Sequence, residues 1–396
     1  MDDNDHRVLG QSLDLYHIQD NAAGMVFWHP RGYAVYRILE DYIRGHMKKY
    51  GFKEIRTPQV MPRELWEKSG HWDKFAENMF TLKDSDNRDF ALKPMSCPCH
   101  LQVYNDRRRS FRELPVRYSE FGACHRNESS GSMHGLMRTR AFEQDDAHVI
   151  CRESQVQHEV ARFITLLDTV YKELGFVDYK VALSTRPEVR AGNDELWDWA
   201  EAQLAEAARQ NDISPIIQSG EGAFYGPKLE FVLTDKQGRD WQCGTVQLDT
   251  VLPARLDAAY YDETDSKSTP VMIHHAVFGS MGRFIAMLLE HYEGNLPFWL
   301  SPDQVAVLPI SMDQAEYASR ITELLSQSDI RTVLYDQNET LSRRLVDVHS
   351  MKIPLSIIVG KTEVANTTVT VREPNGKQHT ILIDELVDFM NVKNTR

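Results

Sequence analysis

The feature that most constrains the fold is a change of pattern near residues 293–302. Pro297 and Pro302 interrupt the strand and helix patterns there, because proline lacks a backbone N–H and restricts the residue before it. Before this break the expected strands are joined by turns, whereas after it strands and helices alternate. The sequence therefore predicts two domains of different architecture, residues 1–298 and residues 299–396.

The carboxy-terminal domain has the pattern of an α/β module with a mostly buried sheet. Its apolar runs are short and nearly continuous, which is typical of strands covered on both faces. Segments with helical spacing lie between them. The expected order is strand 304–310, helix 313–327, strand 331–335, helix 340–350, strands 355–360 and 367–372, a turn at 374–376, and a last strand and helix.

The larger domain is predicted to have an α+β fold built on antiparallel strands. Apolar residues recur at helical spacing over 33–50, 155–174 and 194–209. The strands expected at 229–233 and 240–248 are joined by a polar turn, which indicates an antiparallel hairpin. The sequences GxxxxGKS/T and GxGxxG do not occur, which excludes the two commonest nucleotide-binding loops.

Composition places the chain among cytosolic globular proteins. Its 42% hydrophobic and 26% charged residues are ordinary values, and it contains no apolar run long enough to cross a bilayer. The amino terminus MDDNDHR is unlike a secretory or transit sequence, and the five cysteines show no disulfide pattern. We therefore expect a cytoplasmic protein without membrane attachment. The net charge of −13 argues mildly against a nucleic-acid partner but does not exclude a local basic patch.

The segment Phe121–Arg138 carries the most informative polar pattern. Arg126 is followed two residues later by Glu128 in a Gly/Ser-rich turn, and Arg138 lies twelve residues on. A guanidinium binds phosphate in a bidentate manner and keeps its charge, while a carboxylate can accept a hydrogen bond from a purine amino group. Alone, such a tripeptide is more often a solvated loop, so the interpretation depends on matching segments elsewhere.

Matching segments do occur, in order. GFKEIRTP at 51–58, FGACHRNE at 121–128 and GSMGR at 279–283 match the three signature motifs of the class II aminoacyl-tRNA synthetases. With the further strings, the chain resembles the threonyl-tRNA synthetase family within that class, over nearly its whole length. These strings are LYH at 15–17, GMVFWH at 24–29, KPMSCP at 93–98, FEQDDAH at 142–148, YGPK at 225–228 and WQCGTVQLD at 241–249.

The resemblance implies a threonine–tRNA ligase with a class II antiparallel-sheet catalytic domain and a small α/β anticodon-binding domain. Such an enzyme activates L-threonine with ATP to threonyl-adenylate and transfers the threonyl group to the 3′ end of tRNA(Thr). The resemblance also implies a homodimer formed through the first motif. The ubiquitin-like and editing domains that usually precede this core in the family are expected to be missing, so misactivated serine would not be corrected in cis.

Two other functions stay open at this point. One is an amino-acid ligase that charges a carrier protein or small acceptor, which would have little use for anticodon contacts. The other is a catalytically silent regulatory paralogue, although the intact Arg126, Glu128 and Arg283 argue against it.

The resemblance further implies one zinc ion per subunit, bound by Cys97, His148 and His274. Their separations are too long for a finger-type spacing, so spacing alone would not select them. Three protein ligands leave an open position for a substrate. In the family the metal takes the amino group and hydroxyl of threonine, so valine is rejected strongly and serine, which lacks only a methyl group, less strongly.

Matched positions also assign the ATP site. Arg126 is expected to hold the α-phosphate, and Arg283 to reach the γ-phosphate from across the base. Glu128 would accept from the adenine amino group, and Phe142 would stack on the ring or simply pack in the core. Arg138 is a second candidate for phosphate binding. Mg²⁺ is expected with ATP, with no protein ligands assigned.

The remaining expected contacts fall into three groups. His71 matches a histidine that accepts a proton during transfer to tRNA, although a structural hydrogen bond would equally explain it. Asn338, Glu363 and Arg372 match positions that contact the anticodon, unless they are ordinary loop polar groups. The amino-acid and adenylate pocket is expected to contain Gln144, Asp146, Tyr225, Lys228, Gln242 and Gln247, with Gln242 also binding ATP and Lys228 also catalytic.

Four residues depart from the family pattern near the expected site. Cys99 replaces a glycine and adds a second thiol beside the metal, and Ser129 replaces a proline. His275 replaces an arginine, and Gly282 replaces a glutamate. If Gly282 lies in the first turn of a helix, the change removes a favourable carboxylate and adds the entropy cost of glycine. The sequence does not say what these changes do.

Overall fold

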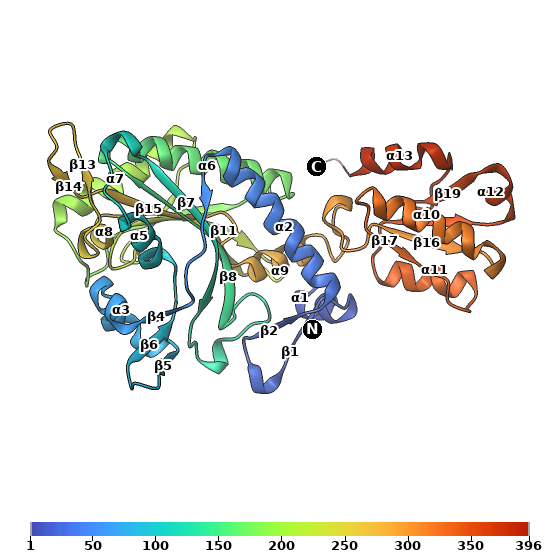
Figure 1. Ribbon diagram of the computed structural model, residues 1–396, viewed down its shortest axis with the longest axis horizontal. Coiled ribbons are helices and arrows are strands. Elements are labelled where there is room, and N and C mark those ends of the chain that lie inside the picture. Colours follow the sequence, from blue (N-terminus) through green and yellow to red (C-terminus); the bar gives the residue numbers. More distant parts are fainter. Residues whose placement is uncertain (1, 395–396) are drawn as a thin grey trace. The chain divides into compact units, whose positions relative to one another are not determined.

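A computed structural model describes residues 2–394 of the protein (Figure 1). The chain forms two compact units, and neither is continuous in sequence. The first unit contains the chain up to His17, Phe27–Leu39, and everything from Leu288 onward. The second contains Ile18–Val26 and Glu40–Met287. The domain boundary between residues 298 and 299 stays a prediction.

The second unit is built on an eight-stranded sheet. Its inner pairs are antiparallel, and only the outermost pairs, β10 with β9 and β7 with β3, are parallel. The expected antiparallel α+β architecture is therefore confirmed. The strand order is β10 (Ile216–Gln218), β9 (Lys180–Ser184), β11 (Lys228–Thr234), β12 (Asp240–Asp249), β15 (Val271–Ala276), β8 (Ala141–Cys151), β7 (Val116–His125) and β3 (Lys53–Glu54).

Helices cover one face of this sheet. Helix α6 (Val156–Glu173) packs on β12 and β15, and α7 (Asp194–Gln210) packs on α6 and β11, as Figure 1 shows. Both helices confirm the segments expected from helical spacing. Gly244 lets α6 approach closely, since a Cβ atom there would lie 2.4 Å from Leu167 Cδ1.

Two shorter helices pack on one end of the opposite face. There α5 (Cys97–Asn105) and α8 (Val251–Arg255) share a core with Ile150 and Met272. The rest of this face remains accessible and holds the cavity described below. The other elements of this unit are α3 (Arg63–Ser69), α4 (His71–Phe75), the small sheet β4 (Val60–Pro62), β6 (Asp89–Leu92) and β5 (Thr81–Lys83), and the hairpin β13 (Tyr260–Tyr261) and β14 (Lys267–Ser268).

The register of the large sheet aligns four polar residues in one row. His148 on β8 pairs with His274 on β15, His274 with Gln247 on β12, and Gln247 with Lys228 on β11. Directly opposed side chains on neighbouring strands point to the same face. Residues spaced by two along β8 share that face as well. The register therefore gathers residues that are far apart in sequence.

The first unit contains a five-stranded sheet, in the order β17 (Thr332–Leu334), β16 (Val305–Pro309), β18 (Leu355–Val359), β19 (Thr368–Arg372) and β20 (Gln378–Leu382). Helices α10 (Ala315–Gln327) and α13 (Leu386–Lys393) bury one face, and α11 (Leu341–Ser350) packs on the other. The predicted α/β order is confirmed. The sequence analysis missed α12 (Lys361–Asn366), because six residues are too few to show a helical period.

Amino-terminal segments complete the first unit. They comprise α1 (His6–Ser12), the strands β1 (Tyr16–Ile18) and β2 (Val26–Trp28), and the start of α2 (Pro30–Lys49), while α9 (Met281–His291) ends in this unit. His6 Nδ1 lies 2.7 Å from Glu290 Oε1, and Arg31 Nε donates to Asp303 Oδ2 at 2.6 Å. Within residues 2–394, the structure contains no helix that is both long and apolar enough to cross a membrane.

Substitution of Gly226 tests the close approach between the segment that precedes β11 and the strand β12. A Cβ atom at Gly226 would lie 1.7 Å from the carbonyl oxygen of Leu248, which is backbone and cannot rotate away. We expect Gly226→Ala to lower the free energy of unfolding by about 1–3 kcal/mol. Gly131→Ala is the control, because its methyl group would meet nothing within 4 Å. Urea denaturation should show a lower midpoint for Gly226→Ala alone, and equal midpoints would contradict the argument.

Candidate active site

A cavity of about 400 Å³ opens on the uncovered face of the large sheet. Its wall contains all but one of the residues expected at the catalytic site, among the residues that the structure describes; the exception is His71. The expected residues in the wall are Cys97, Arg126, Glu128, Arg138, Phe142, Gln144, Asp146, His148, Tyr225, Lys228, Gln242, Gln247, His274 and Arg283.

Cys97, His148 and His274 converge at one end of this cavity. Each offers a ligand atom, and these atoms all lie within 4.8 Å of one another. Cys97 is the first residue of α5, while the two histidines face each other across β8 and β15. His148 Nε2 and His274 Nδ1 are 2.9 Å apart. All three side chains are buried.

The outer nitrogen of each histidine has its own partner. His274 Nε2 lies 2.9 Å from Asp249 Oδ2. His148 Nδ1 lies 2.8 Å from His100 Nδ1, and His100 Nε2 lies 3.2 Å from Glu120 Oε2. Each ligand histidine is thus connected to a buried carboxylate, His274 directly and His148 through His100.

The carboxylate of Glu120 is held in its ionised form. Burial alone would raise its pKa, but hydrogen bonds from His100 and Thr57 and the charge of Lys93 lower the pKa to about 2. Lys93 Nζ lies 3.0 Å from Glu120 Oε2 and also donates to Thr57 Oγ1 at 2.9 Å. A buried charge without such partners would be costly.

The cluster suits a cation rather than a set of free side chains. Burial raises the pKa of the Cys97 thiol far above its usual value and lowers that of His148 far below its own. Burial therefore keeps His148 neutral, the form that binds a metal, whereas the Cys97 thiol needs a nearby cation to ionise. Cysteine sulfur and imidazole nitrogen are the ligands that Zn²⁺ prefers. The donor set therefore fits zinc.

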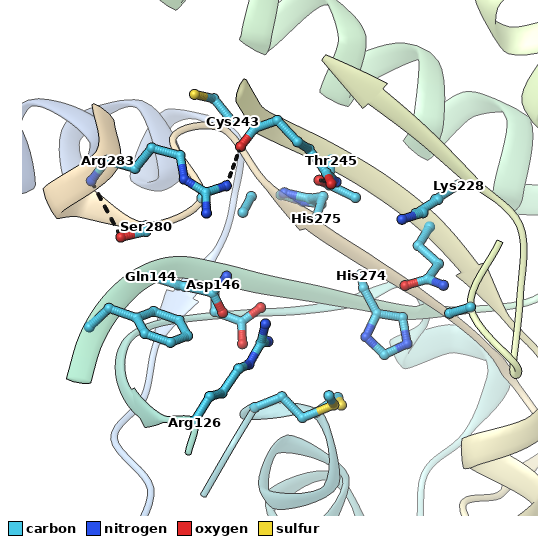
Figure 2. Close-up of a pocket in the computed structure, with 18 of the residues that line it drawn as sticks. Arg126, Gln144, Asp146, Lys228, Cys243, Thr245, His274, His275, Ser280 and Arg283 are labelled. Carbon is cyan, nitrogen blue, oxygen red and sulfur yellow. Dashed lines mark hydrogen bonds between the residues drawn. The ribbon is translucent and has the colours of Figure 1, made fainter. Parts of the chain in front are cut away.

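Arg126 and Asp146 occupy the middle of the cavity. Figure 2 shows the Arg126 side chain directed towards Asp146 on β8. The guanidinium lies 5.2 Å from the centre of the Phe142 ring, and its Nε donates to the carbonyl of Pro94 at 3.2 Å. Burial raises the pKa of Asp146. The arrangement offers a fixed cation beside an aromatic face.

Arg283 lies at the other end, anchored by main-chain oxygens (Figure 2). Its Nε donates to the carbonyl of Met137 at 2.8 Å, and one terminal nitrogen donates to the carbonyl of Gln242 at 2.6 Å. Burial lowers its pKa. Carbonyl oxygens hold the side chain without neutralising it, so the positive charge remains available to an anion.

Asp145 holds the loop that leads to Arg283. Its two carboxyl oxygens accept hydrogen bonds from the backbone N–H groups of Val277, Phe278 and Gly279, at 2.8 to 3.1 Å. Burial raises the pKa of Asp145 to about 7, against the effect of these hydrogen bonds. Asp145 faces away from the cavity, because its neighbours Gln144 and Asp146 face into it.

The wall nearest β11 and β12 carries further polar groups. Lys228 Nζ lies 2.6 Å from Glu230 Oε1, and Gln247 Nε2 donates to the carbonyl of Gly226 at 2.9 Å. Gln242 Nε2 donates to Thr245 Oγ1 at 2.6 Å. These side chains are therefore held in place before any ligand binds.

His71 lies behind the cavity wall. Its ring is fully buried, 6.2 Å from the ring centre of Phe75 and 6.3 Å from that of Tyr225. Nδ1 lies 2.7 Å from Ser69 Oγ, whereas Nε2 has no hydrogen-bond partner among the described residues. Burial lowers its pKa to about 3, so the ring is neutral at pH 7.

The residues expected to contact an anticodon lie in the first unit. Glu363 accepts hydrogen bonds from Thr370 Oγ1 at 2.9 Å and from the backbone N–H of Gly360 at 2.8 Å. Arg372 is exposed at the end of β19, two residues from Thr370 and on the same face. Asn338 is exposed in the loop between β17 and α11.

The four departures from the family pattern do not alter the ligand cluster. The Cys99 thiol forms a hydrogen bond with Thr57 and is not one of the three clustered ligand atoms, so it does not act as a second thiol at that cluster. The ring of His275 packs on Phe52 and Phe163. Ser129 is exposed, and Gly282 lies in the first turn of α9, which meets the condition considered for it in the sequence analysis.

Sequence reasoning missed several residues that support the site. All but Thr245 are buried polar groups with partners from other elements, and burial is not visible in a single sequence; Thr245 is half-buried and accepts from Gln242 on its own strand. Asp249 ends a string that was recognised for other reasons, which is the nearest available signal. The missed residues are Lys93, His100, Glu120, Asp145, Thr245 and Asp249.

Comparisons with known proteins identify the family of both parts of the chain. A model of the tRNA synthetase class II core domain (G, H, P, S and T) matches residues 80–292. A model of an anticodon binding domain matches residues 304–393. The RNA binding domain of threonyl-tRNA synthetase from Cryptosporidium parvum Iowa II, a solved structure, is similar with a TM-score of 0.92 and 36% identity, covering 99% of each chain.

Curated relatives are also similar over nearly the whole chain. A threonine–tRNA ligase of Nitrosomonas eutropha is 54% identical over 375 residues, 95% of this chain and 59% of that protein. One from Wolbachia pipientis subsp. Culex pipiens is 48% identical over 387 residues, 98% of this chain and 61% of that protein. The chain spans about three fifths of the length of these relatives. It belongs to the class II aminoacyl-tRNA synthetases, within the threonyl-tRNA synthetase family.

Proposed function

We propose that this protein is a threonine–tRNA ligase of the cytosol that activates L-threonine with ATP and transfers it to tRNA(Thr). The observation that carries the proposal is the meeting of a Cys/His/His cluster with Arg126 and Arg283 in one cavity. The threonine–tRNA ligases among its relatives support the substrate. The five cysteines, all buried and unpaired, support a reducing compartment.

Cys97, His148 and His274 would hold one zinc ion. Zinc, when bound, would supply an electrophilic position for the amino group and hydroxyl of threonine. Gln247 lies beside His274 in the cross-strand row, and Asp146 and Tyr225 also border this end of the cavity. These side chains would orient the amino acid. A site built to bind a hydroxyl rejects an analogue that lacks it, because its polar groups are then left unsatisfied.

In the activation step a carboxylate oxygen of threonine attacks the α-phosphorus of ATP, and the bond to pyrophosphate breaks. Arg126 would neutralise the charge that develops on the α-phosphate. Arg283, held by carbonyl oxygens, would contact the γ-phosphate, with Arg138 as a further phosphate ligand. Glu128 would accept from the adenine amino group while Phe142 stacks on the ring. Mg²⁺ would accompany ATP through phosphate oxygens.

In the transfer step a ribose hydroxyl of tRNA attacks the carbonyl carbon of the adenylate, and AMP leaves. The hydroxyl proton needs an acceptor. His71 Nε2 has no hydrogen-bond partner among the described residues, which supports a role as acceptor, whereas a pKa of about 3 makes the ring a weak base. Its place behind Phe75 and Tyr225 supports the structural alternative instead. An assay that separates the two steps decides between them.

ATP–pyrophosphate exchange tests the activation step. We expect exchange that depends on threonine, disappears on zinc chelation and returns with Zn²⁺. Serine should support it about 10- to 200-fold less well and valine less still. Arg126→Ala should lower exchange by about 10²- to 10³-fold. Arg107→Ala, an exposed arginine outside the cavity, should not. No exchange from folded, zinc-loaded protein would contradict the proposal and favour a silent paralogue.

Charging of tRNA(Thr) tests the anticodon residues separately. Asn338→Ala and Arg372→Ala should leave exchange unchanged and raise the KM for tRNA, by a factor that corresponds to about 1–3 kcal/mol per lost base contact. Lys377→Ala, in the exposed turn between β19 and β20, is the matched control. A KM for tRNA that is unchanged in both variants would remove these residues from the interface. His71→Asn should slow charging but not exchange if the ring accepts the proton.

We also propose a homodimer formed through the first motif. An apolar cavity of about 230 Å³ lies beside it and is lined in part by Met47, Phe52 and Phe121. A second copy would cover these side chains. Sedimentation equilibrium at micromolar concentration should give a dimer, and Phe121→Asp should shift it towards monomer. Val177→Asp, at an exposed apolar residue outside this cavity, should not. A wild-type monomer would contradict this proposal.

A further inference from the structure

The two ligand histidines of the proposed zinc site are held from behind by carboxylates. A neutral imidazole has one N–H and one lone pair, so whatever binds one nitrogen determines which group the other presents. His274 and His148 turn one nitrogen each towards the cluster and the other towards Asp249 and His100, respectively. Figure 2 shows the His274 side chain among the residues that line the cavity.

We propose that Asp249 and Glu120, the latter through His100, are positioning residues that fix the tautomers of His274 and His148 for metal binding. This inference rests on the proposed zinc site, and it adds the determinants of that site's preorganisation. None of the three residues touches the metal in this scheme.

Asp249 determines the state of His274. An ionised carboxylate only accepts hydrogen bonds, so His274 must carry its proton on Nε2, 2.9 Å from Asp249 Oδ2. Nδ1 then presents a lone pair to the cluster. The other oxygen, Oδ1, accepts from the backbone N–H groups of Val251 at 2.7 Å and Leu252 at 2.9 Å. The start of α8 therefore fixes the orientation of the carboxylate.

Glu120 determines the tautomer of His148 through the ring of His100. His100 must donate from Nε2 to Glu120 Oε2, which leaves a lone pair on His100 Nδ1. His148 Nδ1 lies 2.8 Å from that lone pair and must donate to it. His148 Nε2 is then a lone pair directed at the cluster. Lys93 and Thr57 hold Glu120 in place and supply the opposite charge.

In this arrangement one nitrogen of each ligand histidine directs its lone pair at the other histidine. His148 Nε2 and His274 Nδ1 are 2.9 Å apart. At this distance two unprotonated nitrogens repel each other unless a cation lies between them. The carboxylates hold both rings in the form that a metal requires. Groups that hold ligand histidines in this way typically change metal affinity by about 10- to 100-fold when they are replaced.

Asp249→Asn is the sharpest test. The amide keeps one oxygen to cap α8, but its NH₂ group donates where Asp249 Oδ2 accepted. His274 would then favour a proton on Nδ1 and lose its lone pair towards the cluster. We expect zinc affinity, measured by competition with a chromophoric chelator, to fall by about 10- to 100-fold. The absorption bands of the Co²⁺-substituted protein should also shift, which a purely structural role would not cause.

His100→Phe tests the second carboxylate without disturbing its ion pair. The variant removes the link to His148 while Glu120 keeps its contacts with Lys93 and Thr57. We expect the same fall in zinc affinity. Asp235→Asn is the control, because Asp235 is also a buried carboxylate with one oxygen on backbone N–H groups and the other on a ring N–H, that of Trp241, although Arg239 Nε donates to that second oxygen as well. It is outside the cluster and should leave zinc affinity and the Co²⁺ spectrum unchanged.

Zinc binding by the wild-type protein separates the proposed metal site from the proposed role of Asp249 and Glu120. If it binds no zinc, the proposed metal site fails, whatever the variants do. If it binds zinc and Asp249→Asn and His100→Phe bind equally tightly with the same Co²⁺ spectrum, the metal site stands and this inference is overturned. Circular dichroism and urea midpoints for each variant establish that the comparison is made on folded protein.

Discussion

The register of the antiparallel sheet is the constraint on which the rest of the structure depends. His148, His274, Gln247 and Lys228 come from four strands and form one row because each is paired directly with the next. Side chains alternate between faces, so a slip of one residue in β15 would replace His274 by His275. That ring packs on the opposite face, against Phe163. A shift of one residue would thus dismantle the ligand cluster.

Two buried carboxyl groups near the cavity have several hydrogen-bond partners each. Glu120 contacts Lys93, Thr57 and His100, and Asp145 accepts three backbone N–H groups. Removing one partner would leave a desolvated group unpaired, which costs far more than the net value of the contact. Arg283 differs, because the main-chain carbonyl oxygens of Met137 and Gln242 hold its side chain. The structure thereby separates groups that support the site from groups that can meet a charged ligand.

Local patterns predicted the carboxy-terminal elements and the long helices of the larger domain, but they missed strands β7, β8 and β15 and predicted few contacts between elements. Helical spacing predicted α6 and α7, and the alternation of strands with helices predicted the carboxy-terminal sheet. The sequence positions of Phe142, Gln144, Asp146 and His148 differ by two, so one strand would place them on one face. No local pattern joins Cys97 to His274, and that trio came from the family resemblance alone.

Other contacts were out of reach for a physical reason. Asp249, His100 and Glu120 matter because packing brings α5, α8 and the sheet together, and such pairings depend on tertiary structure rather than on sequence spacing. The helix α12 was missed because its six residues carry too short a pattern.

Because the cysteines are buried, the rate at which their thiols react can measure local unfolding of the protein. All five are buried, and burial raises the pKa of each thiol. The thiolate is the reactive form, so a thiol reagent at neutral pH must wait until the structure around a cysteine opens. All five positions fall between residues 97 and 243, within the second unit. The labelling rate would therefore report local unfolding of the catalytic sheet and would not report unfolding of the anticodon-binding domain.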